Sequence, residues 1–210
     1  MPLCFPKSPS SKNMIKELVI AVYNKDYSWV NKLDPKVKIT PYRKGNNVLL
    51  PGEIYMPVNV GKGDHTIFHH LYTNYDNLAD ITFFSQDYPF DHVINYVDII
   101  NGDETLWEDK GHQQKPGCWF FCTQYAVINC NRRGAPHSPR LNMLKMWEQL
   151  FDTPCPQTFH FTPTMHFAIS KEYAHTLPRS RYKQIMDILA TEPDSPWEIE
   201  RLAPYIFSLI

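Results

Sequence analysis

The sequence predicts an α/β fold, a single Rossmann-like domain with a mainly parallel central sheet flanked by helices. Short apolar runs that suit buried strands, at 17–23 and 80–84, alternate with segments of helical spacing. The length of 210 residues also lies within the range of one domain. This alternation implies parallel strands joined by right-handed crossovers.

The first half of the chain carries the clearest elements. The predicted strands are 17–23, 37–42 and 80–84, and the predicted helices between them are 26–33 and 65–75. The glycines at 61 and 63 form a turn before the second of these helices, and Asp64 is placed to cap it. After Glu17, the run 17–23 is continuously apolar, which is typical of a strand covered on both faces.

The second half has a less regular pattern. Residues 101–140 are rich in Gly, Pro, Asn and charge, which predicts long loops around one or two short strands. The elements predicted after them are a helix over 140–151, a short strand over 167–170, helices over 171–175 and 182–190, and an amphipathic segment over 197–207. Glu200 and Arg201 belong to this last segment, so we expect structural roles for both.

Composition limits the classes of protein and the domain boundaries. Residues 1–14 are dominated by Pro and Ser and are predicted to be a flexible N-terminal arm, with one domain over 15–210. A net charge of −1 without long basic runs argues against nucleic acid as a partner. No window approaches the ~20 apolar residues of a membrane span. Five cysteines without a Cys-x-x-Cys pair predict a reducing, cytoplasmic setting.

Polar clusters follow the predicted strands. They are Tyr23-Asn24-Lys25-Asp26, Tyr42-Arg43-Lys44 and Ser85-Gln86-Asp87. Ligands of parallel α/β sheets bind outside the carboxyl ends of the strands, so the sequence predicts that these clusters build one site.

Asp87 has two interpretations at this stage. Its carboxylate suits Mg²⁺ or Mn²⁺ held between diphosphate oxygens. The alternative is a turn or helix cap, which is the commoner role for an aspartate after a strand. Asn59 and Gly61 stand before a helix and can present amides to a phosphate, although a plain turn explains them equally well. His65 and His69 lie four residues apart, but no glutamate accompanies them as in a His-Glu-x-x-His zinc site.

Several segments resemble glycosyltransferases of the GT-A type. The segment 19–24 is similar to their first strand, which ends in Tyr-Asn, and 79–87 is similar to the run toward their Asp-x-Asp motif. Residues 166–170 resemble an acceptor-side strand, and 200–207 resembles a closing Glu-Arg-Leu segment.

A closer resemblance is to an uncharacterised domain family of fungal and bacterial proteins. The shared motifs are Tyr-Asn-x-Asp-x-Ser-Trp (23–29), Asn-Val-Gly-x-x-x-His-Thr (59–66) and Phe-x-Gln-x-x-Pro-Phe-x-His (84–92). They cover most of 17–92, and similarity returns over the last ~45 residues. That family has no settled activity, so function has to be argued from the site.

The GT-A resemblance implies a GT-A-type fold and a glycosyltransferase that moves a sugar from a nucleotide-sugar donor to a glycan or other hydroxyl acceptor. It implies Mn²⁺ or Mg²⁺ at Asp87. The donor-binding residues that it implies are Tyr23, Asn24, Asp26, Asn59, Gly61 and Gln86. The candidates to take the acceptor proton are Asp91, His92, Glu108 and Asp109.

The chain departs from the GT-A pattern at two places. Ser85-Gln86-Asp87 retains one carboxylate of the Asp-x-Asp motif, and Thr164 and Met165 stand where small glycines usually approach the acceptor. Metal binding has then shifted toward Asp91 and His92, or the protein works without a metal. The competing functions are a carbohydrate- or nucleotide-binding module without turnover, and a metal-dependent hydrolase that rests on the histidines alone. The oligomeric state stays open.

Overall fold

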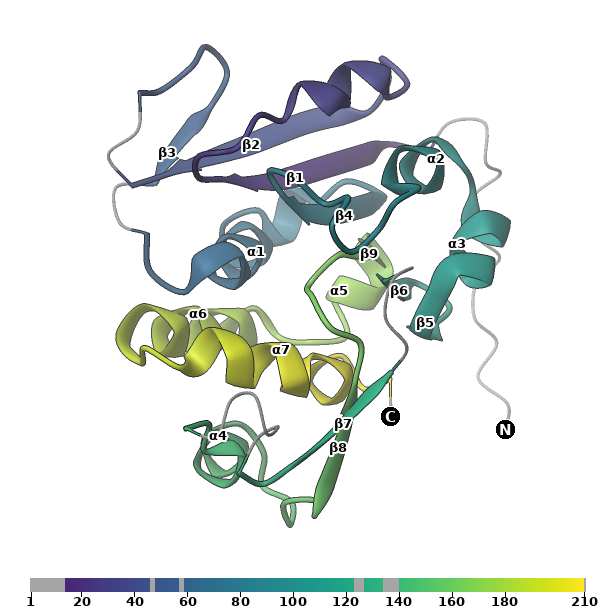
Figure 1. Ribbon diagram of the computed structural model, residues 1–210. Helices are drawn as coiled ribbons and strands as arrows, with labels where there is room; N and C mark the ends of the chain where they lie inside the picture. The colour runs from purple at the N-terminus through teal and green to yellow at the C-terminus, as the bar shows by residue number, and fades with distance from the viewer. Residues whose placement is uncertain (1–13, 46–47, 57–58, 123–126, 134–139, 210) are drawn as a thin grey trace.

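The computed structural model describes residues 14–45, 48–56, 59–122, 127–133 and 140–209 (Figure 1). The strands are β1 (Lys16–Val22), β2 (Lys38–Lys44), β3 (Ile54–Met56), β4 (Ile81–Gln86), β5 (Gly111–Lys115), β6 (Cys118–Phe121), β7 (Ile128–Asn131), β8 (Thr158–Phe161) and β9 (Phe167–Ser170). The helices are α1 (Lys62–Thr73), α2 (Tyr96–Asn101), α3 (Glu104–Lys110), α4 (Met143–Leu150), α5 (Lys171–Ala174), α6 (Arg179–Thr191) and α7 (Ser195–Ile206), with 3₁₀ turns η2 (Ser28–Lys32) and η3 (Tyr75–Asn77).

Seven strands form one sheet in the order β3-β2-β1-β4-β9-β6-β5, and β7 and β8 form a separate two-stranded ribbon. The strands β3, β2, β1 and β4 pair in parallel. β9 runs antiparallel to both β4 and β6, and β5 runs antiparallel to β6. The predicted mixed α/β class with a mainly parallel central sheet flanked by helices is therefore confirmed. Short strands over 167–170 and within 101–140 were predicted, but their antiparallel pairing at one side of the sheet was not.

Each face of the sheet is covered by its own hydrophobic core. On one face α1, α6 and α7 pack over side chains that include Val19 and Phe84. On the other face η2, α2 and α3 pack over Leu18, Ile20 and Phe83. Figure 1 shows α6 and α7 stacked beyond α1 on the first of these faces. Strand β1 is thus buried on both sides, which explains its continuous apolar sequence.

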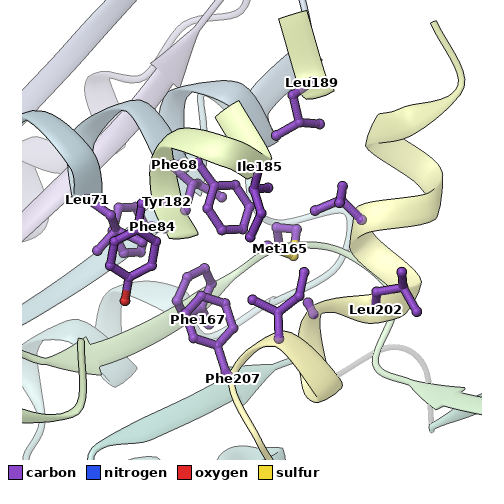
Figure 2. Close-up of a cluster of buried hydrophobic side chains, with 14 of the residues drawn as sticks. Phe68, Leu71, Phe84, Met165, Phe167, Tyr182, Ile185, Leu189, Leu202 and Phe207 are labelled. Atoms are coloured by element: carbon purple, nitrogen blue, oxygen red, sulfur yellow. The ribbon is translucent and has the colours of Figure 1, made fainter. Parts of the chain in front are cut away.

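Stacked aromatic rings hold α7 onto the sheet. The rings of Phe120 and Phe167 are nearly parallel at 4.7 Å between centroids, and Phe207 lies 5.2 Å from Phe167. Figure 2 shows Phe167 and Phe207 together with Met165, which belongs to the same cluster. Offset aromatic contacts of this kind stabilise a core beyond the area that they bury. The cluster fixes α7 against the start of β9, and the pocket described below lies at this junction.

The structure corrects several predicted boundaries. The region predicted as long loops contains α3 and the β5–β6 hairpin, and the short strands β3 and β8 were not predicted at all. The predicted helix over 26–33 is only the 3₁₀ turn η2. Residues 1–13 of the predicted arm lie outside the described residues, while Met14 packs against the core beneath η2, α2 and α3. None of the described helices is long and apolar enough to cross a membrane.

A buried ion pair closes the β2–β3 connection. The Arg43 guanidinium donates from Nε to Glu53 Oε2 at 2.9 Å and from Nη2 to Glu53 Oε1 at 2.5 Å. The Tyr27 hydroxyl and the Leu50 amide also donate to this carboxylate, at 2.8 and 2.7 Å. The Glu53 side chain is fully buried, and that of Arg43 is 9% exposed. All of these donors depend on one carboxylate.

We expect Glu53→Gln to lower the free energy of unfolding by about 1.5–3 kcal/mol, the range for hydrogen bonds to charged groups. Glutamine keeps the shape but leaves Arg43 without its counter-charge. Urea unfolding of both proteins measures the change. Lys183→Gln is the control, because its ion pair with Asp187 lies on the surface of α6. Equal effects of the two substitutions would contradict the importance of the buried pair.

Candidate functional site

A pocket of ≈ 540 Å³ opens where β4 ends and α1 begins. The side chains of Ser85 and Gln86 at the end of β4 line it, together with Lys62, Gly63 and Asp64 at the start of α1. The loop before β9 and the first half of α7 close its other sides. The volume is in the usual range for small-molecule sites. The pocket therefore lies at the carboxyl edge of the parallel strands, where the sequence predicted a ligand site.

Two carboxyl groups line one wall of the pocket. Asp64, half-buried, lies in the first turn of α1, and Glu200 lies on α7. Burial and the neighbouring charge of Glu200 raise the pKa of Asp64 well above its usual range, and Lys44 and Lys62 oppose this only in part. Asp64 therefore keeps its proton at pH values where an ordinary aspartate is ionised. A pair of this kind can hold a proton above the pH range in which an ordinary carboxyl group loses it.

Glu200 is positioned by its neighbours. Its Oε1 accepts a hydrogen bond from the Thr164 amide, and its Oε2 lies 3.5 Å from Arg201 Nη1. Arg201 is 2% exposed, donates to the Trp197 carbonyl and lies over the Phe161 ring. The predicted structural role suits Arg201. Glu200, in contrast, lines the pocket.

Trp197 provides an aromatic wall beside the carboxyl pair. It stands one helical turn before Glu200 on α7, and the Lys62 ammonium lies 3.8 Å from the centre of its ring. Residues three apart on a helix share a face, so both reach the same pocket. Indole faces bind cations and the apolar faces of sugar rings.

Two histidines lie on the wall formed by the end of β4 and the start of β9. The ring centroids of His92 and His166 are 6.0 Å apart. His166 is 2% exposed, and burial lowers its pKa to about 3, with a further contribution from His92. Burial also lowers the pKa of His92. Both rings are therefore uncharged at neutral pH, so this wall is polar but neutral.

Backbone strain concentrates at the pocket. Among the described residues, three other than glycine have positive φ: Lys62 at 50°, Thr164 at 73° and Ser208 at 53°. The first two line the pocket. A β-branched residue in this region costs roughly 1–3 kcal/mol, and such strain clusters at functional sites. The bond from the Thr164 amide to Glu200 holds the strained loop against α7.

Asp87, the predicted metal ligand, binds backbone amides in this structure. Its Oδ2 accepts hydrogen bonds from the amides of Tyr23, Asn24 and Lys25 at 3.1, 3.1 and 2.9 Å. Its carbonyl accepts from Trp29 Nε1 at 2.8 Å. The described part of the chain contains no group of three or more His, Cys, Asp or Glu side chains placed to hold a metal ion. The arrangement fits a carboxylate that fixes the loop after β1, and the metal role of Asp87 stays a prediction.

The predicted catalytic residues, and Gln86 from the predicted donor-binding set, are dispersed. Gln86 and His92 line the pocket. Asp91 is exposed and pairs with Lys25 at 3.3 Å. Asp109 is exposed on α3 and pairs with the adjacent Lys110, and Glu108 is exposed on the same helix. The structure therefore brings two of the predicted residues together and leaves the three carboxylates outside the pocket.

Of the predicted donor-binding residues, Gln86 lines the pocket and the others do not. Tyr23, Asn24, Asp26 and Asn59 are exposed. Asp26 accepts hydrogen bonds from the amide and hydroxyl of Ser28. These residues form part of the surface at the carboxyl edge of the sheet.

Gly61 has a structural explanation. It is the residue before α1, with a φ of 58°, and a Cβ there would lie 2.8 Å from the Leu189 carbonyl. It therefore permits α1 to pack closely on α6. Asp64 was predicted to cap this helix, and this prediction is wrong, because α1 begins at Lys62 and Gly61 precedes it.

Sequence reasoning missed the carboxyl pair and Trp197. Asp64 was assigned as a cap, and Glu200 was expected to be structural. The available signal was the three-residue spacing of Trp197 and Glu200 on one helix, a polar group beside an aromatic ring within an otherwise apolar face. No local sequence pattern indicates that this face of α7 packs beside the start of α1.

The buried histidines predict acid sensitivity. Burial lowers the pKa of His70 to about 4 and that of His166 to about 3, below the ordinary value of 6.5. The unfolded chain then binds more protons below pH 6.5, so this stability is present above pH 6.5 and is lost as the pH falls toward 4. Between pH 6.5 and pH 5, each of these histidines therefore lowers the free energy of unfolding by about 2 kcal/mol. Asp64 acts in the opposite sense, because its pKa is raised.

The measurement is urea unfolding at pH 7 and pH 5. We expect the wild type to lose stability at pH 5 and His166→Phe to lose about 2 kcal/mol less, because one buried histidine is gone. His160→Phe, on the exposed side of β8, is the control and should behave as the wild type. If His166→Phe and the wild type lose the same free energy of unfolding between pH 7 and pH 5, His166 is not a source of the acid sensitivity.

A protein-family model matches most of the chain. Residues 18–210 match the family described as "Protein of unknown function (DUF3431)". Neither a curated protein nor a solved structure matches the chain. The match spans the sheet, the helices and every residue of the pocket.

Proposed function

Because the chain belongs to this family of proteins of unknown function, DUF3431, we propose a function from the pocket itself: transfer of a sugar from a nucleotide-sugar donor to a hydroxyl group, such as that of a glycan. The observation that carries the proposal is the pair Asp64 and Glu200 beside Trp197. Sugar transfer needs a group that takes the proton of the acceptor hydroxyl. It also needs a surface for the sugar ring, and tryptophan is suited to this.

The proposed chemistry is a displacement at the anomeric carbon. The acceptor oxygen forms the new glycosidic bond, its proton passes to the Glu200 carboxylate, and the bond to the nucleoside diphosphate breaks with its electron pair on the diphosphate. Asp64, protonated because of its raised pKa, donates a hydrogen bond to an oxygen of the sugar. Lys62 and the N-terminus of α1 favour the negative charge of the departing group.

The proposal uses no metal-dependent step. The carboxylate predicted to bind Mn²⁺ or Mg²⁺, that of Asp87, already accepts three backbone hydrogen bonds. Charge on the leaving group is instead opposed by Lys62 and the helix N-terminus. Whether a divalent cation adds to the rate is a direct question for the assay.

The test is release of nucleoside diphosphate from a panel of UDP- and GDP-sugars, with and without mono- and disaccharide acceptors. Each reaction runs once with Mn²⁺ and once with EDTA. We expect acceptor-dependent release that persists in EDTA. Release only with Mn²⁺ would contradict the metal-free chemistry, and no release from any donor would contradict sugar transfer.

The second candidate is a carbohydrate- or nucleotide-sugar-binding protein without turnover. It is favoured by the structural use of Asp87, since Oδ2 of the only carboxylate in Ser85-Gln86-Asp87 accepts three amide hydrogen bonds of the loop after β1. The same panel separates the two functions. Thermal stabilisation by a nucleotide sugar without release of diphosphate would support binding alone.

A further inference from the structure

A buried histidine in the neutral wall of the pocket has an unused ring nitrogen. His166 lines the pocket, is 2% exposed, and its Nδ1 has no hydrogen-bond partner among the described residues. The ring makes a hydrogen bond to the Phe84 carbonyl. Since Nδ1 is unpartnered, Nε2 makes that bond and carries the proton. Nδ1 is then left with a lone pair, which accepts a hydrogen bond.

A second polar atom of the pocket is also unused. The hydroxyl of Thr164 is buried without a partner within the described part of the chain. Thr164 adopts the strained backbone described above, and its amide is held by Glu200. Buried polar groups are rarely left without partners, and an exception calls for an explanation such as an absent ligand. A hydroxyl can donate or accept, so it complements the acceptor Nδ1 of His166.

The pocket wall around His166 is uncharged. Ser85 and Gln86 are neutral, and burial keeps the rings of His92 and His166 in their neutral form. The side of the pocket formed by α7 carries Glu200, and the lining cation Lys62 lies over the Trp197 ring on that helix. An anionic group on the ligand ring would meet like charge at Glu200 and no cation among the lining residues at the end of β4 and the start of β9. A sugar ring that bears only hydroxyl groups can form hydrogen bonds on both sides of the pocket without charge repulsion.

We propose that the pocket selects the ring of an uncharged sugar, with one ring hydroxyl donating to His166 Nδ1 and a neighbouring hydroxyl bonding to the Thr164 hydroxyl. Uronic acids and sugar phosphates are excluded. This inference rests on the proposed function in assigning a sugar to the pocket. It goes further in naming the sugar class and the residues that select it.

The test measures binding in the absence of turnover. The intact protein is titrated by calorimetry, with saturation-transfer NMR for weak ligands. The neutral set is glucose, galactose, mannose and N-acetylglucosamine, and the charged set is glucuronate, galacturonate and glucose 6-phosphate. We expect at least one neutral sugar to bind, and its charged counterparts to bind at least tenfold more weakly. Comparable binding of both sets, or no binding of any neutral sugar, would overturn the proposal.

Two variants test the residues. His166→Phe should weaken binding of the best neutral sugar at least tenfold, about 1.4 kcal/mol. His166→Asn, which keeps a polar atom near the Nδ1 position, should stay within about threefold of the wild type. Thr164→Val keeps the branched shape of the strained residue, removes its hydroxyl, and should weaken binding about three- to tenfold. Unchanged affinity in both His166→Phe and Thr164→Val would assign these residues to packing alone.

The variants are chosen to fold. Phenylalanine fills the volume of the histidine ring, and the Phe84 carbonyl keeps its hydrogen bond from the Tyr96 hydroxyl at 2.7 Å. His160→Phe, outside the pocket, is the control and should bind as the wild type. The same titrations with the nucleotide-linked form of the best sugar show whether the ring is bound as donor or acceptor. A tenfold loss in His166→Phe for either form supports the proposal, and no loss for both overturns it.

This inference and sugar transfer can fail separately. If the protein binds a neutral sugar selectively and through His166 but releases no diphosphate, the inference holds and the proposed sugar transfer is wrong. Release of diphosphate at an unchanged rate and affinity in His166→Phe would sustain transfer and overturn the inference.

Discussion

Glu200→Gln is expected to lower the rate of sugar transfer by about 10²–10⁴-fold, the usual contribution of a general base. The glutamine oxygen still accepts from the Thr164 amide, so the strained loop should stay in place. The amide has no charge with which to take the acceptor proton. The variant should therefore lose rate and keep its affinity for the sugar. The assay is release of nucleoside diphosphate, with urea unfolding to confirm that the protein is folded.

Asp64→Asn tests the other half of the pair. It removes the proton held by the raised pKa of Asp64 and should lower the rate less than Glu200→Gln does. Because the two carboxyl groups act together, the double variant should be little slower than Glu200→Gln alone.

Glu198→Gln is the matched control. It lies on the same helix, but its carboxylate accepts from the Asn142 amide, outside the pocket. An equal loss of rate in Glu198→Gln and Glu200→Gln would indicate damage to α7 instead of lost catalysis. An unchanged rate in Glu200→Gln would remove Glu200 from the mechanism.

Asp87→Ala is expected to lower the free energy of unfolding by about 3–5 kcal/mol, because three amides lose one charged acceptor. The amides of Tyr23, Asn24 and Lys25 lie at an exposed turn, so water replaces part of this loss. Asp87→Asn keeps an oxygen acceptor and should cost less, about 1–2 kcal/mol. Urea unfolding measures both variants.

Binding separates the two interpretations of Asp87. A structural carboxylate predicts that Asp87→Asn loses stability and leaves the affinity for a nucleotide sugar the same with Mn²⁺ or EDTA. A metal ligand predicts unchanged stability and at least about a tenfold loss of Mn²⁺-dependent affinity. Asp80→Ala is the control, because that carboxylate accepts from one backbone amide, that of Ile15. If Asp87→Ala lowers the free energy of unfolding no more than Asp80→Ala does, the hydrogen bonds from three amides to Asp87 do not stabilise the fold as we propose.

The parallel half of the sheet could be predicted from local sequence. The run 18–22 in β1 is apolar at every position, and the run 81–84 in β4 is interrupted only by Thr82. Both faces of these strands are covered, and burial on two faces leaves such a nearly continuous apolar signature. The same rule placed a ligand site at the carboxyl edge of the sheet, where Gln86 and His92 line the pocket. These features depend on periodicity and chain order, which the sequence contains.

Only the tertiary structure decided which polar residues meet in the pocket. Asp64 and Glu200 lie far apart in the chain and come together because α7 packs beside the start of α1. The roles of Asp87 and Gly61 were likewise decided by distant partners, the amides after β1 and the backbone of α6. A carboxylate has the same local sequence whether it meets an amide, a second carboxylate or a metal. The sequence therefore determined the sheet and the edge that carries the site, whereas the packing of α1, α7 and the loop before β9 determined its chemistry.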